Sequence, residues 1–330
     1  MQVGSDVRPK AASLSVLDGN IQARIAGIRC AASDTNLYEL DRLDGAAFPS
    51  FEPGAHIDLH LPNGMVRQYS LIGAGDNPTT YVIGVKFDRN GRGGSRYVHE
   101  DLRIGDVVAV SEPRNNFPLV ETTDPVVLIA GGIGITPIWS MVQHLLASGR
   151  PWQLHYSARA QSEAVFFEHL KPLAQVSFHF DDENNGRFLD IDSIVSSAPD
   201  NAHLYCCGPK PMLEAFERSA LRLPRAKVHT ESFGARLSAA TQGGFTVELA
   251  RSRRTFMVPQ GQTILQVLRE AGVDVASSCE QGVCGACETG LISGTPEHHD
   301  AVLTDDERAA NDRVMICCVG CINGPLVLDL

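Results

Sequence analysis

At 330 residues, 43% of them hydrophobic, the chain is long enough to bury the cores of two or three domains. Its formal net charge of −11 argues against a nucleic-acid partner, because phosphates require a basic surface. Nine cysteines in a chain without an export signal favour reduced thiols in the cytoplasm, some of them holding metal, over a disulfide framework.

Residues 1–20 are expected to form a disordered lead-in. They contain no apolar run of signal-peptide length. No stretch approaches the roughly 18 uninterrupted apolar residues of a membrane-spanning helix, so we expect no membrane segment.

Residues 21–122 alternate short apolar runs with turns. Runs such as AHIDLHLP and YVIGVKF are separated by PNG, GDNP and NGRGG. Many short strands joined by glycine-rich turns are typical of an antiparallel β-barrel.

One strand of this predicted barrel carries RQYS, residues 67–70. The forked guanidinium of Arg67 suits a phosphate, Tyr69 supplies an aromatic wall, and Ser70 offers a hydroxyl to a polar edge. Downstream, VKFDRNGRGGS (85–95) ends in a glycine-rich turn before a predicted helix, whose first amides also suit a phosphate. The motif is short, so a half-exposed strand without a ligand is the alternative interpretation.

Residues 123–234 alternate buried strands with helices. PVVLIAGG, WQLHYSA, VSFHF and AHLYCCG are predicted strands, with helices at ITPIWSMVQHLLASG, EAVFFEHLKPL and PMLEAFERSAL. This alternation predicts a parallel α/β sheet. LIAGGIGITPI (128–138) suits a pyrophosphate, although it lacks the G-x-G-x-x-G fingerprint and an ordinary strand–helix connection is the alternative. YCCGPKPM (205–212) lies at the carboxyl end of a later strand, where such sheets bind ligands.

Residues 235–244 are small, polar and glycine-terminated, as in a linker, and residues 245–330 follow as a third domain. FTVELA and RTFMVP predict a hairpin, TILQVLREAG predicts a helix, and PLVLDL closes the chain as a strand.

Between that helix and the last strand lies a group of cysteines with a recognisable spacing. Cys279, Cys284 and Cys287 form C-x4-C-x2-C, and Cys317 follows thirty residues later. Structural zinc sites pair their ligands as two short clips, whereas three ligands on one loop and a distant fourth are typical of a plant-type 2Fe–2S cluster. We therefore expect a 2Fe–2S cluster, with zinc as the alternative. Cys318 and Cys321 leave the fourth ligand open on spacing alone.

Taken in this order, RQYS, GGIGITP and CGP resemble the ferredoxin–NADP reductase superfamily. With a C-terminal ferredoxin domain, residues 21–330 resemble the phthalate dioxygenase reductase-type proteins of two-component Rieske oxygenases, which include vanillate demethylase and toluenesulfonate monooxygenase reductases. The resemblance implies a multidomain fold: an FMN-binding β-barrel, an NADH-binding α/β domain and an α+β ferredoxin-like (β-grasp) 2Fe–2S domain. It implies that a hydride passes from NADH to FMN, and that single electrons then pass through the cluster to a terminal Rieske non-haem iron oxygenase. We expect a cytoplasmic monomer.

The resemblance also implies the site residues. Ser70, Cys207 and Phe233 would act where the flavin meets the nicotinamide, with Ser70 near flavin N5. The position of VMIC before the last ligand selects Cys317. The cofactor-binding residues would be Arg67, Tyr69, Ser70, Val85, Lys86, Gly93, Gly94 and Ser95 for FMN, and Gly132, Gly134, Thr136, Pro137, Cys207, Gly208 and Pro209 for NADH.

Several alternatives stay open. Ser157 and Arg159 suit the extra phosphate of NADPH, and the nearest acidic residue is Glu163, but the resemblance favours NADH and we predict NADH. A stand-alone flavin-dependent diaphorase and an electron carrier that has lost nucleotide binding are competing functions. His298 and His299 are expected in a solvated turn.

Overall fold

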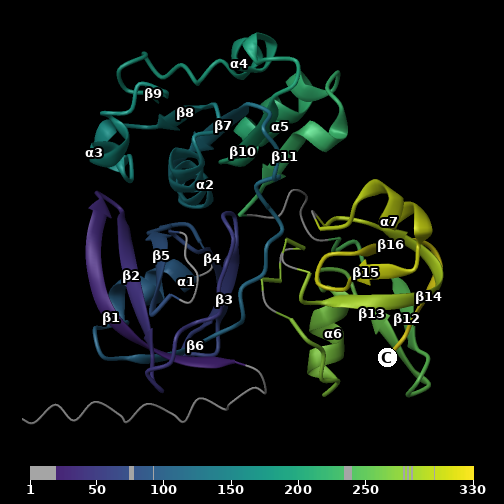
Figure 1. Cartoon of the computed structure of the whole chain (residues 1–330). Helices are drawn as coiled ribbons and strands as arrows, with labels where there is room; N and C mark the ends of the chain where they lie inside the picture. Colours follow the sequence, from purple (N-terminus) through teal and green to yellow (C-terminus); the bar gives the residue numbers. More distant parts are fainter. Residues whose placement is uncertain are drawn as a thin grey trace, which may run out of the picture.

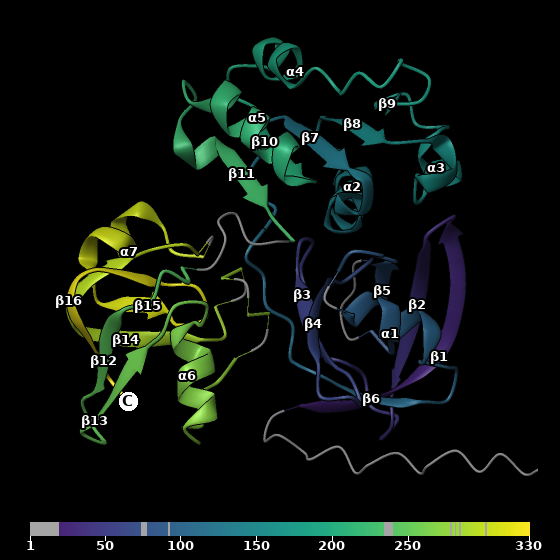
Figure 2. The same ribbon diagram turned by 180° about the vertical axis from the view of Figure 1, so that it is seen from behind.

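The computed structural model describes residues 20–73, 78–91, 93–233, 240–277, 279–280, 282–283, 285–300 and 302–330. They form three units, each built on its own sheet (Figure 1). The unit that contains residues 123–233 lies above the other two, which stand side by side beneath it (Figure 2). Parts of the chain named in the sequence analysis lie outside the described residues: residues 1–19 of the predicted lead-in, residues 235–239 of the predicted linker, and the predicted ligand Cys284. No helix in the described part is both long and apolar enough to cross a membrane.

The first unit is the predicted antiparallel barrel. Its strands are β1 (Ile21–Ala32), β2 (Thr35–Arg42), β3 (His56–His60), β4 (Val66–Ser70), β5 (Thr80–Lys86) and β6 (Val107–Val110), in the order β4-β3-β6-β1-β2-β5. An antiparallel bridge between Leu71 and Ile83 joins the two edges. Helix α1 (Gly94–Glu100) follows β5, and Val98 from it packs into the barrel core.

The second unit is the predicted parallel sheet. Its strands β7 (Val126–Gly131), β8 (Trp152–Ala158), β9 (Val176–Phe180), β10 (His203–Cys207) and β11 (Val228–Glu231) lie in the order β11-β10-β7-β8-β9. The order reverses between β7 and β10, so the ligand crevice of such a fold lies at their carboxyl ends.

Helices α2 (Ile135–Ser148), α3 (Phe167–Leu170), α4 (Ile191–Ser197) and α5 (Lys210–Ala220) cover this sheet. Separate apolar clusters fill its two faces, one including Trp139 of α2 and the other Phe216 of α5. The helix predicted for EAVFFEHLKPL is much shorter than expected. Phe166 has a left-handed φ of 63°, which interrupts any helix before α3 begins.

The third unit has the strands β12 (Phe245–Leu249), β13 (Arg254–Val258), β14 (Glu288–Glu297), β15 (Arg313–Met315) and β16 (Gly320–Leu328) in the order β13-β12-β16-β14-β15. The predicted hairpin is confirmed as the antiparallel pair β12 and β13, while β16 pairs parallel to β12. Helix α6 (Ile264–Glu270) begins at a Thr263–Gln266 capping box and buries Ile264, Leu265 and Leu268 against the sheet. Helix α7 (Asp305–Ala310) precedes β15.

Direct contacts hold the barrel to the second unit. The Ser140 hydroxyl of α2 donates to the Leu71 carbonyl at 2.8 Å and accepts from the Gly73 amide at 3.1 Å. The Ser33 amide at the β1–β2 turn donates to the Ser162 carbonyl at 2.9 Å. The carboxyl end of the parallel sheet therefore faces the barrel.

Candidate functional site

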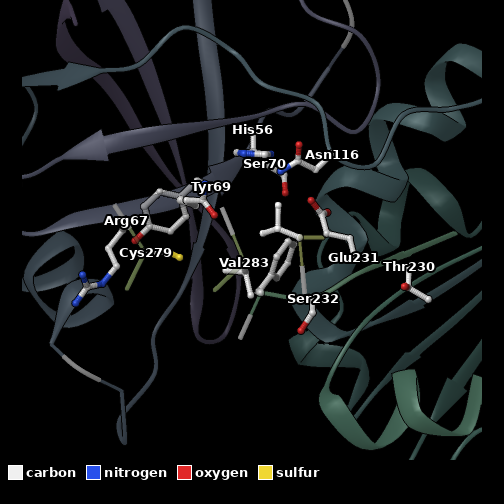
Figure 3. Close-up of a pocket in the computed structure, with 13 residues that line it drawn as sticks. His56, Arg67, Tyr69, Ser70, Asn116, Thr230, Glu231, Ser232, Cys279 and Val283 are labelled. Atoms are coloured by element: carbon white, nitrogen blue, oxygen red, sulfur yellow. The ribbon is translucent and has the colours of Figure 1, made fainter. Parts of the chain in front are cut away.

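A cavity of about 280 Å³ lies where the three units meet (Figure 3). The barrel, the end of β11 and the cysteine-bearing loop each contribute part of its wall. The lining residues are His56, Arg67, Gln68, Tyr69, Ser70, Asn116, Thr230, Glu231, Ser232, Phe233, Cys279, Val283 and Val302.

Strand β4 places the RQYS motif along one wall of this cavity. The Ser70 side chain is buried, and its hydroxyl has no hydrogen-bond partner among the described residues. The Gln68 side-chain amide nitrogen is also buried and has no hydrogen-bond partner among the described residues. Buried polar groups are normally satisfied, so this wall is suited to a ligand with a polar edge.

Some of the residues predicted to bind the FMN phosphate lie close together beside β4. A Cβ atom on Gly94 would lie 2.1 Å from Arg67 Nε, so only glycine lets this guanidinium lie against the start of α1. Gly93 precedes the helix with a left-handed φ of 84°. The Ser95 hydroxyl accepts a hydrogen bond from the Asp88 amide at 3.0 Å, which ties the start of α1 to the residues that follow β5.

The glycine turn after β7 meets the end of β10. Gly132–Gly134 forms a single 3-10 turn leading into α2. A Cβ on Gly134 would lie 2.2 Å from the Cys207 carbonyl oxygen, so the two turns touch through their backbones. Thr136 and Pro137 are buried in the first turn of α2, and the Thr136 methyl packs beside Gly84 of the barrel.

Cys207 and Glu231 are neighbours on the parallel strands β10 and β11, and their Sγ and Oε2 atoms are 3.9 Å apart. Burial raises the pKa of Glu231 to about 8. Burial and the Glu231 carboxylate raise the pKa of Cys207 well above its usual range, so the Cys207 side chain is a neutral thiol at pH 7.

Three predicted cluster ligands lie within the described residues, and all three are buried: Cys279, Cys287 and Cys317. The Gly282 amide donates to Cys317 Sγ at 3.2 Å. The Cys287 side chain is hydrogen-bonded with that of Cys317, and this contact together with burial raises the pKa of Cys287. No group of three or more His, Cys, Asp or Glu side chains is arranged as a metal site within the described residues, a set that lacks Cys284.

The loop geometry nevertheless fits a 2Fe–2S cluster. Gly282 and Gly285 have φ angles of 68° and 76°, which allow the backbone to wrap inward. An amide aimed at a cysteine sulfur is the interaction that a net-negative cluster requires. Arg269 of α6 anchors the loop through Glu280 at 2.9 Å and Ser277 at 2.8 Å.

Comparison with known proteins agrees with this arrangement. Residues 128–218 match the oxidoreductase NAD-binding domain, and residues 247–321 match the 2Fe-2S iron-sulfur cluster binding domain. The chain is 48% identical to the phenoxybenzoate dioxygenase subunit beta of Ectopseudomonas oleovorans, over 94% of this chain and 97% of that protein. It is 44% identical to the tetrachlorobenzoquinone reductase of Sphingobium chlorophenolicum, over 94% and 98% of the two chains.

A solved structure covers the whole arrangement. The structure of phthalate dioxygenase reductase, described as modular for electron transfer from pyridine nucleotides to [2Fe-2S], superposes with a TM-score of 0.74 at 40% identity, covering 95% of this chain and 98% of that one. The chain belongs to the phthalate dioxygenase reductase family. It is an oxidoreductase with a flavin-type barrel, an NAD-binding domain and a 2Fe–2S domain.

In this reductase, five predicted flavin residues do not line the cavity. Three of them, Gly93, Gly94 and Ser95, belong to the start of α1, and the other two, Val85 and Lys86, make contacts elsewhere. Val85 is fully buried in the barrel core, and its carbonyl oxygen lies 2.9 Å from His99 Nε2. Lys86 forms ion pairs with Asp34 and Glu163, both at 3.0 Å. Lys86 thus links the barrel to the nucleotide unit.

Phe233, by contrast, lies at the cavity with 43% of its surface exposed, as expected for a residue that covers a ligand. Gly208 packs between Gly131 and Met212, and Pro209 caps α5. Both lie at the switch point of the reductase, as the motif predicts.

Eight residues that line the cavity of the reductase are not among the predicted site residues, and His56, Asn116 and Glu231 are three of them. The His56 ring is buried, and neither nitrogen has a hydrogen-bond partner in the part of the chain that the structure describes. Burial together with Arg114 lowers the pKa of His56 to about 4. It reaches the cavity because β3 pairs with β4, which sets His56 opposite Ser70. Of these three, Glu231 has a sequence signal, its place two residues before Phe233 in TESFG.

The pKa of Glu231 gives a testable pH dependence. Below about pH 8 the carboxyl is neutral, and above it a negative charge beside Cys207 opposes the arrival of negative charge in the cavity. We expect the rate of NADH-dependent flavin bleaching to fall above this pH, and the fall to disappear in Glu231→Gln. Stopped-flow absorbance on both sides of the midpoint measures it. The same decline in the variant would assign the ionisation to another group.

Proposed function

We propose that this reductase transfers a hydride from NADH to FMN and passes the electrons singly, through a 2Fe–2S cluster, to a terminal Rieske non-haem iron oxygenase. One observation carries the proposal. A single cavity is lined by RQYS of the barrel, by the end of β11 in the nucleotide unit, and by Cys279 of the cluster loop. A cofactor in that cavity is in reach of both a nucleotide and a cluster.

The chain's own residues divide the work of binding. Arg67, Gly93, Gly94 and Ser95 would hold the FMN phosphate, with the guanidinium supplying a forked cation. Tyr69 would line the ring, Ser70 would approach N5, and Phe233 would cover the opposite side of the cavity. Val85 and Lys86 would support the same pocket from β5. Gly132, Gly134, Thr136 and Pro137, with Cys207, Gly208 and Pro209, would shape the NADH site at the switch point.

The order of the cofactors follows from electron counting. NADH gives two electrons as a hydride, whereas a 2Fe–2S cluster accepts one. A flavin accepts two electrons and releases them one at a time, so it belongs between the two. The cluster would be held by Cys279, Cys284, Cys287 and Cys317.

The remaining proposals concern the setting of the protein. Two features of the chain support a partner that is a protein rather than a nucleic acid: its net charge of −11 and its relatives among oxygenase reductases. We propose a cytoplasmic monomer that meets the oxygenase transiently.

A reduction experiment tests the function. Anaerobic NADH is expected to bleach the flavin absorbance and then the cluster bands, and acid-released flavin is expected to run as FMN on chromatography. FAD as the main flavin, or cluster bands without flavin bleaching, contradicts the proposal. A stand-alone reductase remains the second candidate because of the tetrachlorobenzoquinone reductase relative. Rapid quinone reduction without electron delivery to any Rieske oxygenase would favour it.

The structure bears on the choice of NADH over NADPH. Glu163 is the acidic residue nearest in sequence to Arg159, and its carboxylate forms an ion pair with Lys86. Two other acidic residues lie near Arg159 because β9 pairs with β8. The Asp181 amide donates to the Ala158 carbonyl at 3.1 Å, and the Asp182 amide donates to the Arg159 carbonyl at 3.0 Å. Asp181 and Asp182 therefore bring negative charge close to the chain at Ser157 and Arg159, which would disfavour the extra phosphate of NADPH there.

We expect a higher kcat/KM with NADH than with NADPH in cytochrome c reduction, and Arg159→Ala to preserve that order. Arg159 is exposed, so its removal is not expected to disturb the fold. A higher kcat/KM with NADPH, lost selectively in Arg159→Ala, would show that Arg159 binds the extra phosphate.

A further inference from the structure

A buried carboxylate lies outside the residues assigned above. The Asp300 side chain is 1% exposed and sits in the loop between β14 and α7. Its Oδ2 accepts hydrogen bonds from the Val302 amide at 3.1 Å and the Leu303 amide at 2.8 Å. Arg308 of α7 donates to the Asp300 carbonyl at 2.7 Å and lies 3.5 Å from the carboxylate. This carboxylate therefore determines the path of the loop.

The neighbouring histidine differs from the sequence prediction. The sequence predicts His298 and His299 in a solvated turn, but their side chains are only 12% and 14% exposed. His298 Nδ1 lies 3.5 Å from Asp300 Oδ1. His298, Asp300 and Arg308 thus form a buried polar cluster, here called the Asp300 cluster. Buried charges are costly unless paired, so such a cluster requires a structural or functional reason.

The Asp300 cluster touches the cysteine loop directly. A Cβ on Gly282 would lie 3.0 Å from Asp300 Cα and 2.5 Å from Cys318 Sγ, so the Gly282 backbone is held between these two residues. Gly282 is the residue whose amide donates to Cys317 Sγ. Asp300 consequently stands one contact away from an amide–sulfur hydrogen bond.

The same loop reaches the cavity. Val302, whose amide Asp300 holds, lines the cavity together with Cys279 and Val283. A Cβ on Gly285 would lie 3.6 Å from Val302 Cγ1, so Val302 also packs on the cysteine loop. The Asp300 carboxylate thus positions Val302, which packs on the cysteine loop and forms an apolar part of the cavity wall.

We propose that Asp300 is the positioning residue of the cluster loop: anchored by the Val302 and Leu303 amides, it packs against Gly282 and holds that residue in place to donate its amide to the cluster ligand Cys317. The inference rests on the proposed ligand set. Through this contact Asp300 keeps the cluster in place, and its charge, balanced by Arg308, contributes to the reduction potential of the cluster.

Two variants distinguish the effect of Asp300 on cluster retention from its effect on the reduction potential. Asp300→Asn keeps an oxygen that accepts from the Val302 and Leu303 amides but removes the charge, whereas Asp300→Ala removes both. We expect both variants to raise the reduction potential, because the positive charge of Arg308 is then unbalanced near the cluster. We expect only Asp300→Ala to accelerate cluster loss to an iron chelator, by about tenfold or more, the usual scale for such supporting residues.

The matched control is Asp306→Asn, which removes one exposed carboxylate from α7 in the same unit. Its charge is screened by solvent, so both readouts should equal those of the parent. The measurements are a redox titration followed by EPR and the rate of cluster bleaching with a chelator.

The outcomes are distinct. Parent-like cluster lifetime and potential in both Asp300 variants, with a normal cluster in the parent, overturn this inference alone. Cluster loss in Asp300→Ala that Asp300→Asn does not rescue also overturns it, because a positioning role requires the acceptor oxygen. A parent without any 2Fe–2S EPR signal overturns the proposed function, and this inference with it.

Discussion

Replacing Cys317 with serine is expected to abolish or distort the EPR signal of the reduced 2Fe–2S cluster, whereas Cys318→Ser leaves it. Both residues are buried, so burial does not separate them. Their sulfurs have different surroundings: Cys317 Sγ accepts the Gly282 amide and lies beside Cys287, while Cys318 Sγ donates to the Met315 carbonyl at 3.6 Å. Serine can replace the second interaction, but it is a poor substitute for a thiolate ligand to iron.

Cys321→Ser is the additional control. Its thiol donates to the Gly324 carbonyl at 2.9 Å within β16, away from the cysteine loop. Iron content, the visible spectrum and EPR of the dithionite-reduced proteins measure the result. Loss of the signal in Cys318→Ser with retention in Cys317→Ser would move the fourth ligand by one residue.

The second large effect is expected from Gly134→Ala. Gly134 has a φ of −61°, which alanine adopts readily, so any loss arises from space rather than backbone strain. The added methyl would lie 2.2 Å from the Cys207 carbonyl oxygen, a backbone atom that cannot rotate away. The turn after β7 must then separate from the end of β10, where both strands contribute to the nucleotide site.

We expect NADH-dependent flavin bleaching to slow by about 100-fold, the scale of a displacement of about 1 Å in a reacting site. Overpacking at this contact should also lower the free energy of unfolding by about 1–3 kcal/mol. Dithionite provides the control, because it reduces flavin and cluster without the nucleotide site and should act equally on both proteins. Parent-like kcat/KM for NADH in the variant would show that the two turns separate without consequence.

The sequence by itself determined the parts of this reductase that depend on neighbouring residues. RQYS, the glycine turn after β7 and the C-x4-C-x2-C loop are local patterns, since strand alternation, tight turns and ligand spacing are set within a few residues. For the same reason the antiparallel barrel and the parallel sheet were predictable in type, and the β12–β13 hairpin and helix α6 were predictable from spacing. The ferredoxin-like fold of the third unit followed from the resemblance to known proteins. The helix predicted at residues 163–173 failed because Phe166 adopts a left-handed conformation, a departure that apolar spacing does not reveal.

Only the tertiary structure decided which distant groups meet. Glu231 reaches Cys207 because β11 lies beside β10, and His56 faces the cavity because β3 pairs with β4. Lys86 binds Glu163 across two units, although the two residues are 77 positions apart. Asp300 contacts Gly282 although the two residues lie on different loops. Such contacts depend on how sheets and loops pack, and packing is a property of the assembled chain rather than of any short stretch of it.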